Sequence, residues 1–511
     1  MNAARWLRGR PARALRSALR KVEDTAAGPL GGRARLRVVV LLAIVLGLDG
    51  ADFSTVGAAA PRLEESLHIS NTEIGLLLTV SQLAAAVATL PIGVLADRTR
   101  RERVIWISIL LWAGAMIASG LSTSYVMLLV SRVALGAVTA AGGPPIASLV
   151  GDFFPAVERG RIYGFVLAGD LVGSGFGVLV SGEVAALSWR AAFLVLAAIS
   201  LGVAVLIWRF LPEPARGGQS RLPAGAAHVR PVEDVPAGER RAPDRDRAGG
   251  RERVEREAVR AGARPVRRNV LRGDPVAMSW TAAVRHVLSV RTNVVLIVAS
   301  SLAYYFLAGV RTFAVVFFRG RYDLSQSIGT ALFGLVGLGA MVGIVAGGRI
   351  ADRLIGRGHH TARIDVAMAS YLLAALLFLP GLLSGDMAVA MPLFFLAAAA
   401  LAAGSAPTDA ARLDIIHFRL WGRAESVRTF LRTVLQAVAP LVFGFISDVL
   451  GGGQAAFGRS SGLPPHHAQG LDIAFLLMLV PLAAAGVILL VARRTYPEDV
   501  ATAAESERRA A

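Results

Sequence analysis

The sequence contains no cysteine, and Lys21 is the single lysine among 54 basic residues. Without cysteine, the chain cannot form disulfide bonds, use a thiol in catalysis or bind metal through Cys ligands. Charged residues make up only 18% of the 511 residues, and 54% are hydrophobic. Soluble proteins average about 25% charged and about 45–50% apolar residues. These proportions exclude an ordinary soluble protein.

Motifs of soluble enzymes are also missing. The chain has no Walker loop, no Gly-x-Ser-x-Gly turn, no His-Glu-x-x-His pair and no cluster of His ligands. ATP-driven pumping within this chain is therefore excluded. We expect no enzymatic activity, no metal site and no cofactor.

Long apolar runs dominate what is present, and the mean hydropathy is +0.56. A helix needs about 20 apolar residues to cross about 30 Å of hydrocarbon. Twelve runs of that kind lie near 38–60, 72–96, 104–121, 125–150, 161–187, 190–211, 292–318, 326–351, 363–383, 387–411, 424–450 and 471–492. The sequence predicts an all-α membrane protein with twelve transmembrane helices in two six-helix bundles.

The basic residues alternate between loops, and this sets the orientation. Ten Lys/Arg precede Val38 and four Arg lie in 97–103, whereas 61–71 has one Arg and two Glu. Because basic loops stay in the cytoplasm, both termini are predicted to be cytoplasmic and the protein to span the cell membrane. Only Arg319 and Arg321 oppose this pattern. The net charge of +18 thus reflects topology, and we expect no nucleic-acid partner.

Five segments follow from these runs. They are a basic cytoplasmic segment (1–37), an N-terminal bundle (38–211), a cytoplasmic linker (212–291), a C-terminal bundle (292–492) and a cytoplasmic tail (493–511). The linker is rich in Pro, Gly and mixed charge, which predicts that it is largely disordered. A short basic amphipathic piece at 280–290 is read as a tether or as a helix on the membrane surface.

An internal repeat relates the two bundles. "GVLADRTRR" (93–101) ends the second helix of the first bundle, and "GRIADRLIGR" (348–357) ends the second helix of the other. Many transporters are built from such repeats, with the substrate site between the halves near the middle of the membrane.

These segments resemble the loop 2–3 signature of the major facilitator superfamily. Further segments resemble its spinster-like branch: "LHISNTEIGLLLTV", "SRVALGAVTAAGGPP", "GDFFPAVERGR", "WRAAFLVL", "GRAESVRTFLRT" and "APLVFGFISD". The resemblance implies carriage of lysophospholipids, sphingoid lipids or other amphiphiles, facilitated or coupled to protons. The sequence departs from that branch at Phe53, where the branch has Arg, and at Thr139, where it often has Glu.

Ionisable residues within apolar helices are costly and should face a cavity and a partner. Asp49 and Asp52 are three residues apart and share one helix face, and two nearby carboxylates favour proton uptake by one of them. Arg132 is their expected counter-charge. The alternative is a static structural ion pair.

Other polar residues complete the candidate site. Asp170 lies in a helix whose glycines, Gly169, Gly173 and Gly177, predict close packing. We expect it to supply the acid that is missing at Thr139, and therefore to join in proton coupling. Arg311, with Tyr304 and Tyr305 before it, is expected to line the substrate cavity with Arg132 and Thr139, or to reach the outer surface.

Loop 2–3 is predicted to be a gate. Asp97 can pair with Arg101 and with Arg428, which would latch the cytoplasmic side in an outward-facing state. The predicted gate consists of residues from both repeat segments together with Arg428: Gly93, Asp97, Arg98, Arg101, Asp352, Arg353 and Arg428.

These observations predict a secondary transporter, driven by a proton gradient, for an amphiphilic or hydrophobic organic solute. The expected partners are this small-molecule or lipid substrate and the membrane lipids, with the protein acting as a monomer. Two alternatives stay open: multidrug or natural-product efflux by antiport, and a membrane sensor or scaffold that does not transport.

Overall fold

The computed structural model describes residues 32–140, 142–154, 156–214, 254–258, 260, 262–271, 275, 278–417, 420–450 and 466–510. Within these residues every regular element is a helix. The N-terminal half contains α3 (Arg33–Leu67), α4 (Asn71–Arg98), α5 (Arg101–Gly120), α6 (Tyr125–Thr139), α7 (Gly143–Phe153), α8 (Ala156–Phe176), the π-helical turn η1 (Gly177–Ser181), α9 (Gly182–Leu187) and α10 (Trp189–Phe210).

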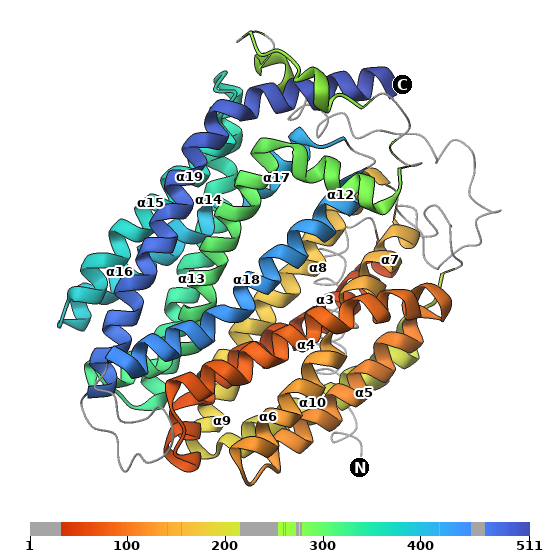
Figure 1. Cartoon of the computed structure of the whole chain (residues 1–511). Helices are drawn as coiled ribbons and strands as arrows, with labels where there is room; N and C mark the ends of the chain where they lie inside the picture. The colour runs from red at the N-terminus through yellow and green to blue at the C-terminus, as the bar shows by residue number, and fades with distance from the viewer. Residues whose placement is uncertain are drawn as a thin grey trace, which may run out of the picture.

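The C-terminal half contains α13 (Arg291–Tyr322), α14 (Gln326–Gly356), α15 (Ala362–Leu383), α16 (Met387–Ala403), α17 (Ser405–Ile415), α18 (Trp421–Leu450) and α19 (His466–Ala510). Because α6 and α7 together form one crossing, as do α8 to α9 and α16 to α17, each half has six crossings (Figure 1). Ten of these segments within the described residues are long and apolar enough to span a membrane. The predicted all-α fold with twelve crossings is confirmed.

Glycines bring the helices of each half close together. A Cβ atom on Gly173 of α8 would lie 1.9 Å from the carbonyl oxygen of Gly47 in α3, and one on Gly343 of α14 would lie 1.9 Å from that of Ala399 in α16. Only glycine permits these approaches. The predicted packing role of these glycine stripes is confirmed.

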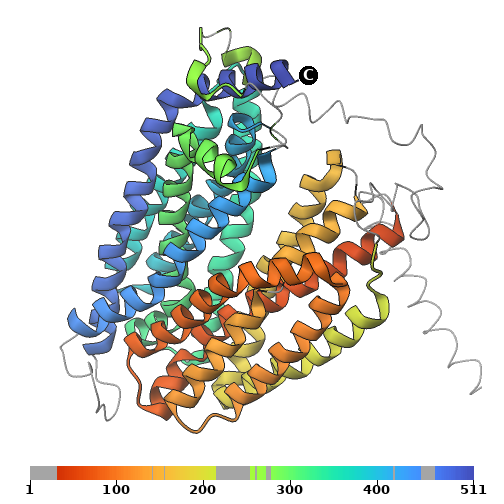
Figure 2. The ribbon, with the colours of Figure 1, turned by 45° about the vertical axis from the view of Figure 1, so that its right-hand side comes forward.

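Two sides of the molecule can be defined from the chain. The linker side carries residues 98–101, 153–154, 211–214 and the start of α13. The far side carries the turns 67–71, 120–125, 322–326 and 383–387. Figure 2 shows the helices of the two halves lying closest on the far side and diverging toward the side where the C-terminus lies.

Part of the linker is ordered, which corrects the prediction for its described residues. Val254 and Ala258 are buried, and the tail of α19 is helical, with Val500 and Ala504 also buried. The backbone N–H of Val266 donates to Thr502 Oγ1. The tail and this part of the linker therefore pack together. Each contributes only a few apolar residues, which are far apart in the sequence and become buried only when the chain folds. Residues 215–253 lie outside the described residues.

The amphipathic piece of the linker forms α12 (Trp280–Ser289), capped by the hydroxyl of Ser279. Its Ala283 and Val287 are fully buried, and it packs against α18 and α13. Trp280, in the first turn of this helix, is exposed.

Candidate functional site

A buried ion pair joins the first and fourth crossings. Arg132 Nη1 of α6 donates to Asp52 Oδ1 of α3 over 2.7 Å. Arg132 is 1% exposed, its Nη2 lies 3.3 Å from Ser119 Oγ, and its guanidinium carbon lies 4.6 Å from the centre of the Phe193 ring. Ser119 belongs to α5 and Phe193 to α10.

All these partners belong to the N-terminal half. The structure thus brings Asp52 and Arg132 together, as expected, but it encloses Arg132 within one half. We expected Arg132 to line a cavity between the halves, and this conformation places it elsewhere. The reason is packing: α5 and α10 cover the face of α6 that carries Arg132.

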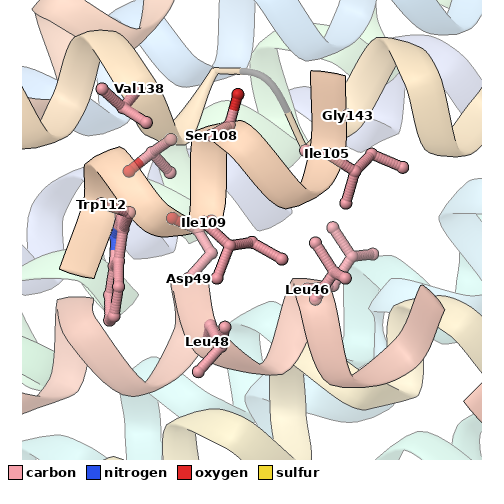
Figure 3. Close-up of a pocket in the computed structure, with 12 residues that line it drawn as sticks. Leu46, Leu48, Asp49, Ile105, Ser108, Ile109, Trp112, Val138 and Gly143 are labelled. Carbon is pink, nitrogen blue, oxygen red and sulfur yellow. The ribbon is translucent and has the colours of Figure 1, made fainter. Parts of the chain in front are cut away.

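Asp49 faces a cavity of about 170 Å³ within the N-terminal half (Figure 3). Ile105, Ser108, Ile109 and Trp112 of α5 line its other side. Thr139 and Gly142–Gly143 line it where α6 gives way to α7, and Thr139 donates to the carbonyl oxygen of Leu135. Among the described residues, Asp49 has no hydrogen bond or ion pair.

Asp170 of α8 approaches the same region from behind α3. A Cβ atom on Gly50 would lie 2.6 Å from Asp170 Oδ1, so this carboxylate touches the backbone of α3. The charges of Asp170 and Asp52 both act on Asp49. The three carboxylates predicted for proton coupling therefore lie together, and Thr139 lies beside Asp49.

The C-terminal half contributes arginines and tyrosines. The backbone oxygen of Arg311 in α13 lies against Gly57 of α3, and the Arg311 charge acts on Asp49 across the two halves. Tyr304 lies on the same face of α13, and the guanidinium carbon of Arg432 in α18 lies 4.4 Å from the centre of its ring. Tyr305 packs instead on Phe443, with the ring centres 6.4 Å apart.

Arg432 was missed by the sequence analysis. The signal was there in "VRTFLRT", where Arg428 and Arg432 are one helical turn apart in an apolar helix.

Hydrogen bonds between the halves gather on the far side. The backbone N–H of Thr72 in α4 donates to Asp448 Oδ2 of α18 over 2.8 Å, and Thr79 Oγ1 donates to the carbonyl oxygen of Ala437. Gln326 Nε2 of α14 donates to the carbonyl oxygen of Ala58 over 2.8 Å. One ion pair, Arg319 with Glu65 at 3.1 Å, also crosses the interface.

Charged networks on the linker side stay within each half among the described residues. Arg101 is 2% exposed, forms an ion pair with Asp152 and donates from Nε to Glu213 Oε1 over 2.9 Å. Burial by itself would raise the pKa of Glu213, but its hydrogen bonds with Glu102 and Arg101 hold that pKa below the ordinary value.

A matching network occupies the C-terminal half. Arg363 at the start of α15 pairs with Asp414 at the end of α17, and the hydroxyl of Tyr496 in α19 donates to the same carboxylate. Arg101 and Asp152 hold the equivalent places, at the start of the third crossing and the end of the fourth. The sequence contains a sign of this equivalence. Asp152 in "GDFF" and Asp414 in "LDII" each precede two large apolar residues at the end of the fourth crossing of their half.

Of the predicted gate residues, Arg101 was expected to pair with Asp97, but it pairs instead with Asp152 and Glu213. The other gate residues fall into three groups. Arg428 Nη1 donates to Asp409 Oδ1 over 3.0 Å and pairs with Glu425, so both partners belong to its own half. Asp352 and Arg353 are exposed at the end of α14. Gly93, Asp97 and Arg98 lie in α4, and their side chains are outside the described part of the chain.

Comparison with known proteins agrees with this architecture. The sequence is 26% identical to the hexuronate transporter of Bacillus subtilis (strain 168) over 203 residues, 40% of this chain and 48% of that protein. It is 28% identical to the 4-hydroxybenzoate transporter of Pseudomonas putida over 185 residues, 36% of this chain and 41% of that one. The chain thus matches less than half the length of these relatives.

The fold is similar to a bacterial homolog of the human lysosomal transporter spinster, solved in an inward-facing and unoccupied conformation. The TM-score is 0.69 at 19% identity, over 91% of this chain and 98% of that one. The sequence pattern of the Major Facilitator Superfamily matches residues 42–364, more than half of the chain. The relatives named above are transporters rather than enzymes. The protein therefore belongs to the Major Facilitator Superfamily and is a multi-pass membrane protein.

Proposed function

We propose that the protein couples the movement of an organic solute to protons, with Asp49 as the proton carrier. One observation carries this proposal: the Asp49 carboxylate faces a cavity, has no partner among the described residues, and lies beside two further carboxylates. Taking up a proton at Asp49 removes repulsion with Asp52 and Asp170. Asp52 itself is held in an ion pair with Arg132.

Alternating access proceeds by rocking one six-helix half against the other. The far side is closed here by hydrogen bonds between the halves. The loop charges place the linker side, with both termini, in the cytoplasm. We therefore assign this conformation to the state that faces the cytoplasm of the cell membrane.

The solute that we propose is amphiphilic, such as a lysophospholipid or a sphingolipid-like molecule. The sequence segments that resemble the spinster-like branch support this class. The hexuronate and 4-hydroxybenzoate relatives are named for smaller solutes, both of which are organic acids. Amphiphilic lipids and organic acids both have a polar end that charged side chains can bind. This shared feature fits the spinster-like proteins as well as the organic-acid transporters.

The test is uptake into liposomes that contain the full-length protein. Lysophosphatidylethanolamine and 4-hydroxybenzoate are offered with and without an imposed proton gradient. We expect the gradient to stimulate uptake in the wild type. In Asp49→Asn this stimulation should vanish, while solute exchange without a gradient remains, because only the proton step is lost.

Asp323→Asn is the matched control, since Asp323 is exposed and has a left-handed backbone conformation that asparagine tolerates. It should behave like the wild type. If Asp49→Asn kept both the gradient effect and the pH profile of the wild type, Asp49 would not be the carrier.

A further inference from the structure

Two half-buried arginines in the membrane-crossing helices of the C-terminal half stand apart from the exposed ones and from those that pair with a carboxylate. Arg363, Arg412 and Arg428 each form an ion pair with an Asp or Glu of their own half, and Arg319 pairs with Glu65. Arg311 and Arg432 have no ion pair among the described residues. Both side chains are half-buried.

An arginine within an apolar helix is costly unless water or a counter-charge reaches it. Arg311 lies 20 residues into α13, about 30 Å from the start of that helix. Arg432 lies 11 residues into α18, about 16 Å from its start. Neither position is at a helix end, so proximity to the membrane surface does not explain them.

Tyr304 links the two arginines. It precedes Arg311 by seven residues, which places both on one face of α13. Long side chains on a helix lean toward its N-terminus, so the Arg311 side chain extends toward Tyr304. The guanidinium of Arg432 stacks on the Tyr304 ring at 4.4 Å. One positive charge is thus stacked on the Tyr304 ring, and a second arginine lies on the same face of α13, two helical turns further along.

We propose that Arg311 and Arg432 bind the anionic group of the solute, and that the transported solute carries a carboxylate, sulfonate or phosphate. Guanidinium groups bind these anions with two parallel hydrogen bonds. Tyr304 provides a ring for the adjacent apolar part of the solute. This assignment rests on the proposed transport function and names the chemical class of its substrate.

The same geometry links anion binding to the proton. α13 packs on α3, where a Cβ atom on Gly57 would lie 2.4 Å from the carbonyl oxygen of Arg311, and Asp49 lies eight residues before Gly57 on the same helix. The Arg311 charge therefore acts on Asp49 across the halves. Asp52 and Asp170 also face Asp49 from α3 and α8, and Arg132 of α6 is committed to Asp52. When Asp49 takes up a proton, Arg311 loses this counter-charge and binds a solute anion more readily. Proton and anion therefore travel in the same direction.

The test uses the purified full-length protein and pairs of probes that differ in charge. One pair is 4-hydroxybenzoate and 4-hydroxybenzamide, and the other is lysophosphatidate and the matching monoacylglycerol. Binding is measured from the rise in Tm with probe concentration. We expect the anion of at least one pair to stabilise the wild type and its neutral partner not to. The pair that responds distinguishes a free carboxylate from a lipid phosphate.

Arg311→Gln and Arg432→Gln should each weaken anion binding at least tenfold, and the corresponding Lys variants should recover part of it. Arg357→Gln is the control, because Arg357 is exposed at the end of α14 and forms no ion pair among the described residues. The Tm without probe shows whether each variant is folded. The Lys variants keep the positive charge if a Gln variant is unstable.

Equal binding of both members of each pair, no binding of either anion, or anion binding unchanged in both Gln variants would overturn the anion site. Two further results distinguish failure of the anion site from failure of the proposed proton-coupled transport. Proton-driven uptake of the monoacylglycerol, unchanged in Arg311→Gln, would leave proton coupling standing without the anion site. Arginine-dependent anion binding with no effect of a proton gradient would leave the anion site standing alone.

Discussion

The buried charge of Arg132 is compensated by a single carboxylate among the described residues. Its guanidinium is enclosed by Asp52, Ser119, Met116 and Phe193, and only Asp52 carries a negative charge. Removing one member of such a pair leaves a buried charge without compensation, whereas removing both costs far less.

Asp52→Asn should therefore destabilise the protein by about 3–5 kcal/mol and lower its Tm. The double variant with Arg132→Met should recover most of the loss, because no charge is left buried. Thermal unfolding in detergent gives both numbers. A double variant less stable than Asp52→Asn alone would show that Arg132 stabilises the fold through its other contacts.

Glu213 gives a prediction about pH. Because its pKa is lowered in the folded protein, its charge contributes stability above its ordinary pKa near 4.5, and this contribution is lost as the pH falls through the lowered value. Glu213→Gln should lower the Tm at pH 7 through the loss of a charged hydrogen bond, worth about 1.5–3 kcal/mol.

The difference in Tm between the wild type and Glu213→Gln should shrink as the pH is lowered from 7 to 3. Asp323→Asn, on an exposed turn, should show no such trend. A difference that stayed constant with pH would mean that the charge of Glu213 does not stabilise the fold.

At the scale of helices, α4 and α18 form the closest contact between the halves. A Cβ atom on Gly75 would lie 2.2 Å from the carbonyl oxygen of Pro440, and one on Gly444 would lie 2.2 Å from that of Asn71. Two crossed helices can approach this closely only through glycine. This contact must separate when the far side opens.

Gly75→Val should therefore shift the population toward the state that is open on the far side. Overpacking costs about 1–3 kcal/mol, which changes the ratio of the two states by about 5-fold to 150-fold. Because the chain lacks cysteine, spin labels on Thr123→Cys and Gly385→Cys can report the distance across the far side. Gly114→Ala is the control, since nothing lies within 4 Å of a Cβ atom there.

At the scale of the whole molecule, the two halves contain the same kind of ion pair on the linker side. An arginine at the start of the third crossing holds an aspartate at the end of the fourth: Arg101 with Asp152, and Arg363 with Asp414. These networks make each half rigid at the side that separates. Rigid halves suit a motion in which one bundle rocks against the other.

The predicted latch between Asp97 and Arg428 belongs to the opposite conformation. Here Arg428 is occupied by Asp409 and Glu425. Asp97→Asn should weaken the state that is closed on the linker side and lengthen the mean distance between labels on Thr99→Cys and Gly356→Cys. An unchanged distance distribution would remove Asp97 from the gate.

The sequence was sufficient for the architecture and for some of the site. Apolar runs long enough to span a membrane, the loop charges and the repeated Ala-Asp-Arg segment depend on local composition, so the twelve crossings and the two halves could be read directly. Asp49 and Asp52 were grouped because they share one helix face, and Arg132 was expected as their counter-charge. Asp170 was added as the acid that is missing at Thr139. Arg432 and the Arg363 network were missed because their partners are distant in sequence.

By itself, the sequence determined that the chain spans a membrane as helices, because apolar length and backbone hydrogen bonding allow little else. Only the tertiary structure decided which charges lie near the other half and which are enclosed within their own. It enclosed Arg132 within one half, left Arg311 and Arg432 without carboxylate partners among the described residues, and ordered part of the linker against α19. The surroundings of a side chain depend on which faces of different helices pack together. The sequence pattern of one helix does not determine this packing.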